Sequence, residues 1–211
     1  MSEIISDGGG NSKLKEALQL IRAAIFIIAI NIGKKPLHKG WPQKATIDEN
    51  QVRAWFDVKD APNIGVVTGY KSGVPCLDVD GPEGLASLEA LERKYGPLNR
   101  SCMARTPSGG LHIFFKMIIG HDIRNSAGKL GPGLDIRANG GYVVVAPSEV
   151  INRDGQLGHY EWLTETTLTS GELPQMEDWL MQWLIENSST PKKAVAAPRD
   201  SAGRAYVSIG I

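Results

Sequence analysis

The sequence predicts a mixed α/β fold in a single domain of moderate size. Segments with apolar residues at helical spacing alternate with short runs of β-branched residues. Three of the strand-like runs also alternate polar and apolar residues, which predicts one face in the core and one polar face. The 211 residues, 42% of them hydrophobic, are enough for a sizeable core.

The first half of the chain is expected to hold two helices and three strands. Leu14, Leu18 and Ile21 follow helical spacing, and the β-branched run at 25–30 then favours a strand. Residues 46–49, "TIDE", have the form of a capping box with Thr46 as the N-cap, so a helix should follow. Strands are expected over 63–69 and 75–79.

The second half is expected to begin with a helix, because Pro82 suits a first helical turn and Gly96-Pro97 would end it. The turn "TPSGG" should join strands over 101–105 and 111–116. Residues 133–148 should form a strand, an Asn-Gly-Gly turn and a buried strand. A late amphipathic helix is marked by Trp179, Leu180, Trp183 and Leu184.

Composition divides the chain into three parts. Residues 1–11 are polar and rich in glycine, so a flexible start is expected before a folded domain over 12–187. Residues 188–211 begin with a Ser/Pro/Lys-rich linker and end in an apolar stretch, which we interpret as the truncated start of a following domain.

Charge and cysteine content narrow the possible partners. The formal net charge is zero, with 23 basic and 23 acidic side chains, so a nucleic acid would have to bind a local basic surface. Seven residues are candidates for it: Lys34, Lys35, Lys39, Arg100, Arg105, Lys116 and Arg137. The two cysteines form no CxxC pair, so no zinc site is expected, and they suit reduced thiols of a cytoplasmic protein. The apolar run at 23–30 is far shorter than the roughly 20 residues that span a bilayer, so no membrane partner is expected.

Two carboxylates follow each other in the strand "CLDVDG". Residues two apart on a strand point to the same face, so Asp78 and Asp80 should lie together. Close carboxylates repel and are costly to desolvate, and a divalent cation such as Mg²⁺ or Mn²⁺ removes both costs. The alternative is a pair of solvated acids at a strand end.

Two more strands carry polar residues on one face. His112 shares a face with Lys116 in "LHIFFK", and Asp135 shares a face with Arg137 in "LDIR". If these strands lie in one sheet with Asp78 and Asp80, three acids can bind metal and the bases can bind a phosphate chain. A structural histidine and a surface ion pair remain the alternatives for His112 and Arg137.

The turn before His112 adds a candidate anion contact. "PSGG" is not a Walker loop, yet such a turn can present backbone N–H groups to an anion. The alternative is a plain hairpin turn.

An ordered set of motifs carries a resemblance to a known family. The set comprises "KKPLHKGW", "NIGVVTG", "CLDVDG", "TPSGGLHIFF", "GLDIR" and "GGYVVVAPS". In this order the chain resembles the bifunctional primase–polymerase domain of the archaeo-eukaryotic primase superfamily, found in replication proteins of plasmids, phages and prophages. The likeness runs from about residue 17 to 148, and more weakly to 162.

The resemblance implies a role for each candidate residue. Asp78, Asp80 and Asp135 match the catalytic acids that hold two Mg²⁺ or Mn²⁺ ions, and His112 matches the histidine that contacts the phosphates of the incoming nucleotide. Arg137 is implied in phosphate or template contact. Relatives often have a serine two residues before the histidine, where this chain has Gly110. Ser108, four residues before, and the backbone at Gly110 are therefore the candidate nucleotide contacts.

The implied fold is an RRM-like catalytic sheet with flanking helices, joined to an N-terminal α/β half, with the active site between them. The implied activity is template-dependent nucleotidyl transfer with a single-stranded DNA template, a primer and NTP or dNTP. Relatives continue into a helical domain and a helicase domain in the same chain. A metal-dependent nuclease and a non-catalytic DNA-binding module of a replication initiator remain the rival functions.

Overall fold

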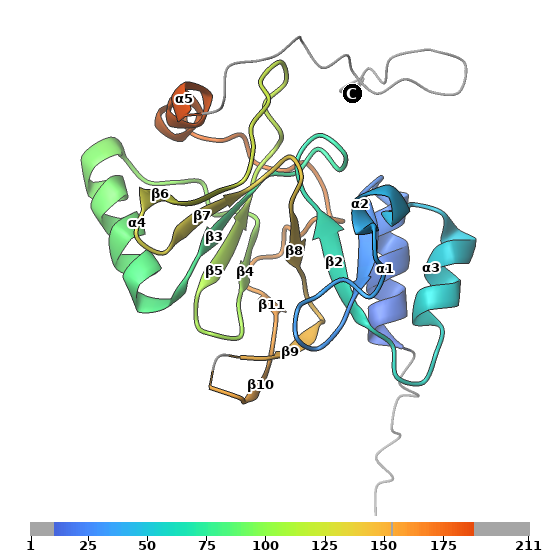
Figure 1. The fold of residues 1–211 in the computed structure, drawn as a ribbon. Coiled ribbons are helices and arrows are strands. Elements are labelled where there is room, and N and C mark those ends of the chain that lie inside the picture. Colours follow the sequence, from blue (N-terminus) through green and yellow to red (C-terminus); the bar gives the residue numbers. More distant parts are fainter. Residues whose placement is uncertain (1–10, 153, 188–211) are drawn as a thin grey trace, which may run out of the picture.

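Two sheets organise the molecule. The computed structural model describes residues 11–152 and 154–187, and shows a mixed α/β fold as the sequence predicts (Figure 1). A three-stranded sheet, called here the small sheet, has the order β1-β2-β8, and a six-stranded large sheet has the order β11-β4-β5-β3-β7-β6. Strands β9 (Glu149–Ile151) and β10 (Leu157–His159) form a separate antiparallel pair.

Helices α1 (Ser12–Arg22) and α3 (Glu49–Phe56) lie beside the small sheet, and a short helix, α2 (Trp41–Lys44), precedes α3 (Figure 1). Their apolar stripes pack with β1 (Ile27–Ile30) and β2 (Asn63–Val67) into one core, in which Phe56 is fully buried. The helix predicted after "TIDE" is present, but its N-cap is Asp48 and not Thr46. Asp48 Oδ1 accepts the Gln51 N–H at 2.8 Å, while Thr46 Oγ1 accepts the Asp48 N–H at 2.9 Å.

The large sheet is centred on β3 (Cys76–Val79), which pairs antiparallel with β5 (Leu111–Phe114) and β7 (Leu134–Arg137). Next to β5 lies β4 (Met103–Arg105), so the order β7-β3-β5-β4 is the order of an RRM sheet. The outer strands β6 (Ser126–Gly131) and β11 (Glu161–Trp162), neither predicted from the sequence, extend this sheet at its two edges.

One face of the large sheet is covered by two helices. Helices α4 (Gly81–Tyr95) and α5 (Asp178–Asn187) bury Leu88, Leu180 and Leu184 against the apolar side chains of β3, β5 and β7. The first turn of α4 contains Pro82, as the sequence predicts. The opposite face carries Cys76 and Phe114, which join the core of the small-sheet half. Because β3 alternates, Asp78 points to this second face as well.

The strand, the turn and the buried strand expected over 133–148 are all present, but the two strands do not pair with each other as in a hairpin. Both edges of β7 are already paired, to β3 and to β6, so β8 (Tyr142–Val144) finds no free edge there and pairs with β2 in the small sheet. The crossover between the sheets at 138–141 is bonded to a second crossover at 68–70. Thr68 Oγ1 donates to the carbonyl of Ala138 at 2.7 Å, and the Tyr70 N–H donates to Asn139 Oδ1 at 2.7 Å.

Residues 1–10 and 188–211 lie outside the described residues, so the flexible start, the linker and the following domain stay predictions. Among the helices that the structure describes, none combines the length and apolar character that crossing a membrane requires.

Candidate active site

The polar residues predicted on three strands meet in one row of the large sheet. Asp78 on β3 is the register partner of His112 on β5 and of Asp135 on β7. Opposed residues of an antiparallel pair lie on the same face, about 4.5–5.5 Å apart. The three strands therefore belong to one sheet, and Asp78, His112 and Asp135 share one of its faces, which is the condition set out from the sequence.

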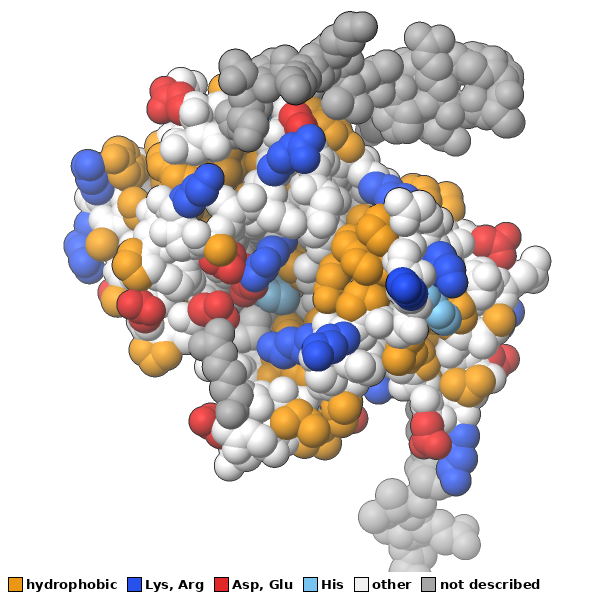
Figure 2. Space-filling view, viewed as in Figure 1, with side chains coloured by type: hydrophobic (Ala, Val, Ile, Leu, Met, Phe, Trp, Pro, Cys, Tyr) orange, Lys and Arg blue, Asp and Glu red, His pale blue; other side chains and the backbone are white. Residues whose placement is uncertain are grey.

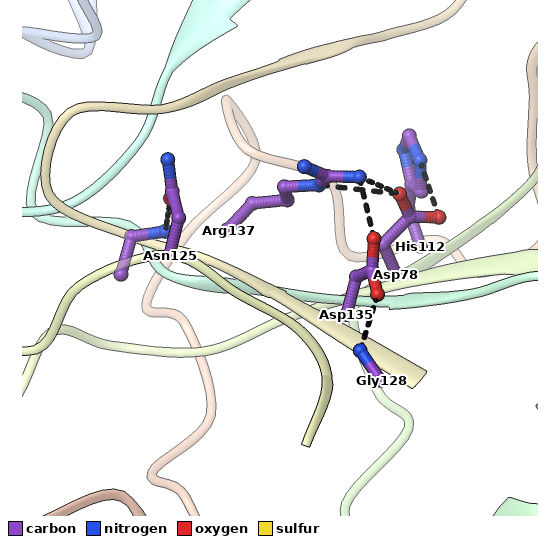
Figure 3. Close-up of polar contacts among 7 residues, drawn as sticks. Asp78, His112, Asn125, Gly128, Asp135 and Arg137 are labelled. Carbon is purple, nitrogen blue, oxygen red and sulfur yellow. Dashed lines mark hydrogen bonds and ion pairs between the residues drawn. The ribbon is translucent and has the colours of Figure 1, made fainter. Parts of the chain in front are cut away.

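Asp78 lies between two basic side chains, with Arg137 on one side of its carboxylate and His112 on the other (Figure 3). The distance from His112 Nε2 to Asp78 Oδ1 is 3.4 Å, and that from Arg137 Nη2 to Asp78 Oδ2 is also 3.4 Å. Arg137 Nη2 also donates to Asp135 Oδ2 at 2.8 Å, and Asp135 Oδ1 accepts the Gly128 N–H at 2.9 Å. One guanidinium therefore bridges two of the three predicted metal ligands.

Burial and pairing act in opposite directions on Asp78, whose side chain is 14% exposed. Burial raises the pKa of the carboxyl, but the hydrogen bond and charge of His112, together with Arg137, outweigh burial. The pKa of Asp78 therefore lies below its ordinary value of 3.8, and the carboxylate is ionised at neutral pH.

The row opens into a cavity of about 360 Å³ between the two halves of the molecule. The large-sheet half contributes acids, His112 and Arg137, while the small-sheet half contributes Lys34 and the strand β8. Figure 2 shows acidic side chains and a histidine in a hollow of the surface, with Lys and Arg side chains nearby. The lining residues include Asp78, Asp80, Thr106, Ser108, His112, Asn125, Arg137, Tyr142 and Tyr160.

The predicted acids are not equally placed. Asp80 lines the cavity from the N-cap position of α4, directly after β3. Asp135 does not line the cavity and is connected to it through Arg137. Within the described residues, no three His, Cys, Asp or Glu side chains already form a group that could hold a metal ion. The carboxylate oxygens suit Mg²⁺ or Mn²⁺ in kind, and Arg137 provides the positive charge between Asp78 and Asp135.

The turn before His112 places its two candidates differently. Ser108 lines the cavity, whereas Gly110 is buried against the end of β3, where a Cβ atom would collide with the carbonyl oxygen of Val79. The N–H of Gly109 donates to Thr106 O at 3.0 Å, and that of Gly110 donates to Thr106 Oγ1 at 3.1 Å. Both N–H groups are thus used inside the turn, so Gly110 shapes the site through close packing.

Several polar residues that line the cavity were not predicted as site residues from the sequence, among them Thr106, Asn125, Tyr142 and Tyr160. Thr106 and Tyr142 belong to the motifs "TPSGGLHIFF" and "GGYVVVAPS". Membership of these motifs could have indicated both residues, whereas the alternation of polar and apolar residues could not. Tyr160 packs on His112 with the ring centroids 5.4 Å apart. Burial raises the pKa of Tyr160, and the charges of Asp78 and Asp80 raise it further, so its hydroxyl stays protonated.

A larger cavity, of about 1250 Å³, lies elsewhere, beside α3 and the loop after β1. Its lining includes His38 and Trp55, whose rings are 4.9 Å apart, but none of the predicted site residues. The smaller cavity is the candidate active site because the convergent titratable groups lie there.

The fold and the cavity together define an α+β protein in which acidic and basic side chains converge in a cavity between two sheets, an arrangement that suits an active site. Residues 17–179 match the family "Bifunctional DNA primase/polymerase, N-terminal". This match covers most of the chain, and the protein belongs to that family, whose members are DNA primases and polymerases. No curated protein matches the chain.

Proposed function

We propose that this chain catalyses template-dependent nucleotidyl transfer, extending and starting DNA-templated strands, at the cavity between the two sheets. Membership of the primase/polymerase family supports the activity class. The observation that carries the proposal is the register row, in which Asp78 lies opposite both His112 and Asp135. This row gathers two carboxylates and an imidazole from three strands on one face.

The acids are proposed to hold the metal ions. Asp78 and Asp80 line the cavity, and Asp135 lies one strand away, so together they would offer hard oxygen ligands to Mg²⁺ or Mn²⁺. Two such ions, when bound, supply the charge that activates the primer 3′-hydroxyl and stabilises the leaving pyrophosphate. Arg137 would then turn from the carboxylates toward phosphate or template, because metal replaces its charge.

His112 and Ser108 are proposed to bind the triphosphate. His112 Nδ1 is buried and has no hydrogen-bond partner among the described residues, so the ring has unused bonding capacity beside the cavity. Ser108 is exposed at the cavity lining, where its hydroxyl can reach a phosphate oxygen. Tyr160 would keep the His112 ring in place through their ring contact.

The proposed substrates are a single-stranded DNA template, a primer and NTP or dNTP. In a longer natural chain the domain would act in a replication protein that also carries a helicase domain. The proposed cellular location is the cytoplasm.

A template-directed extension assay tests the proposal. The chain is incubated with a labelled primer–template, Mg²⁺ or Mn²⁺, and each nucleotide class in turn, and then with an unprimed template. We expect products that lengthen one nucleotide at a time only when template, metal and nucleotide are all present. Glu89→Gln, on the exposed side of α4, serves as a control variant with unchanged activity.

The same time course separates the rival functions. Shortening of the primer in the absence of nucleotide would identify a metal-dependent nuclease. DNA binding without lengthening or shortening under any metal would identify a non-catalytic DNA-binding module.

A further inference from the structure

Lys34, a basic residue of the small-sheet half, lines the same cavity as Asp78 and His112. It lies in the loop between β1 and α2, far in the sequence from the polar strands of the large sheet. Lys35 and Lys39 belong to the same loop but do not line the cavity. The position of Lys34 therefore sets it apart from its neighbours.

Hydrogen bonds hold the backbone of the loop at Lys34. Asn31 Oδ1 accepts the N–H groups of Gly33 and Lys35, each at 2.9 Å, and the Lys34 N–H donates to the Asn31 carbonyl at 3.0 Å. Tyr142 Oη of strand β8 donates to the carbonyl of Lys34 at 3.0 Å. The loop is thus attached to the sheet that forms one wall of the cavity.

The backbone of Lys34 adopts a conformation that residues with a Cβ atom rarely take, with φ at +64°. Such a conformation persists where the surrounding bonds require it, and it is more frequent at ligand sites. Here the bonds to Asn31 and Tyr142 fix it. The result is a lysine on an exposed loop whose side chain leaves the backbone in a set direction.

The Lys34 ammonium lies over the ring of Tyr160, which lines the cavity. Its Nζ lies 5.9 Å from the centroid of the Tyr160 ring, and the Tyr160 ring in turn contacts His112. Within the described residues Lys34 forms no ion pair, whereas Arg137 is bonded to both Asp78 and Asp135. The positive charge of Lys34 is therefore available to a ligand, while that of Arg137 is already shared between two carboxylates.

We propose that Lys34 binds the phosphate oxygens of the incoming nucleoside triphosphate, an inference that rests on the proposed function. A triphosphate carries several negative charges, and within the cavity Lys34 is the cation with no acidic partner among the described residues. The nucleotide would then contact both halves of the molecule, His112 from the large sheet and Lys34 from the small-sheet half. Lys34 thereby leaves the set of residues expected to form the DNA-binding surface.

Equilibrium binding to the full 211-residue chain tests this inference. The probes are a non-hydrolysable nucleoside triphosphate and, separately, a fluorescent primer–template without nucleotide. We expect Lys34→Ala to weaken triphosphate binding roughly tenfold or more, the range of a charge-assisted contact. Binding of the primer–template should change less than about twofold, because backbone contacts are spread over many basic residues.

Two variants make the measurement specific. Lys34→Arg keeps the positive charge and should retain most of the triphosphate affinity. Lys44→Ala removes an exposed lysine of α2 that does not line the cavity, and should leave triphosphate binding unchanged. Unchanged triphosphate affinity in Lys34→Ala would overturn the inference, and so would a loss confined to the primer–template.

The result is independent of the extension assay. A wild-type chain that binds triphosphate through Lys34 but never lengthens a primer would refute the proposed function and leave this inference standing. If the wild-type chain lengthens primers but Lys34→Ala binds triphosphate with unaltered affinity, the proposed function stands and the inference about Lys34 is refuted.

Discussion

Asp78 and Asp135 are register partners on neighbouring strands, and one Arg137 nitrogen, Nη2, is bonded to a carboxylate oxygen of each. A guanidinium in this position relieves the repulsion between two carboxylates that would otherwise face each other without a cation. Arg137 thus supplies the positive charge between Asp78 and Asp135 that a divalent cation is proposed to supply during catalysis.

The first prediction is that Arg137→Gln increases the affinity for Mn²⁺ in the absence of nucleotide. Without the guanidinium, no described side chain bridges Asp78 and Asp135, so a bound metal ion would relieve more repulsion, and about 1.4 kcal/mol of such relief corresponds to a tenfold change in affinity. Calorimetric titration with Mn²⁺ measures it. Arg124→Gln is the control, because Arg124 also pairs with an aspartate, Asp122, but its own side chain is 65% exposed. Equal or weaker Mn²⁺ binding in Arg137→Gln would show that the arginine does not occupy the place of the metal.

The second prediction concerns the pH dependence of stability. The pKa of Asp78 is held below 3.8 in the folded chain, so its ionised form stabilises the fold above that pH. Asp78→Asn should therefore lower the free energy of unfolding at pH 7, by about 1–3 kcal/mol. The difference from wild type should shrink as the pH falls below 3.8. Repulsion between the carboxylates alone would make Asp78→Asn more stable than wild type. The expected change is a loss of stability because Asp78 is paired with His112 and Arg137.

Urea unfolding at a series of pH values between neutral and acid measures this difference. Glu89→Gln, which removes an exposed carboxylate on α4, should show no such dependence. A stability difference that stays constant through the acid range would contradict the prediction.

The third prediction is that Asp80→Asn abolishes nucleotide transfer without unfolding the protein. Asparagine is as good an N-cap as aspartate, and the Asp80 side chain makes no capping hydrogen bond to α4, so the helix should start normally. A metal ligand contributes several kcal/mol to the transition state, so a loss of about 100-fold or more is expected. Single-nucleotide extension and thermal unfolding are measured together. Near-normal extension by folded Asp80→Asn would remove Asp80 from the metal site.

The fourth prediction is that His112→Ala weakens nucleotide binding roughly tenfold or more while single-stranded DNA binding persists. His112 is buried beside Asp78 at the cavity, whereas His159 is 73% exposed and outside it. His159→Ala is therefore the matched control. Equal nucleotide affinity in His112→Ala and wild type would refute the assignment.

Period-two patterning predicted much of the fold and the core of the site. It placed Asp78, His112 and Asp135 on polar faces, and the register of the large sheet brings those faces together. Helices α1, α3, α4 and α5 follow from apolar spacing and turn residues. Strands β6, β9, β10 and β11 were not predicted because they are short or poor in buried residues, and their pairing depends on distant partners.

Partner choice between strands could not be read from the sequence. "IRANGGYVV" has the form of a hairpin, and only the occupied edges of β7 show why β8 joins β2 instead. For the same reason the meeting of Lys34, Tyr142 and Tyr160 with His112 was not foreseen. These residues come from segments that are distant in the chain and contact one another only through the arrangement of the two sheets.

The paired crossovers have a consequence for substrate selection. Two connections run between the small sheet and the large sheet, one at 68–70 and one at 138–141. Hydrogen bonds join them, from Thr68 to Ala138 and from Tyr70 to Asn139. The two halves are therefore joined at this place by two connections that are hydrogen-bonded to each other, and not by a single linker. If the cavity binds nucleotides as proposed, such a joint favours selection by the fit of the nucleotide to walls already in place over selection by a large closing motion.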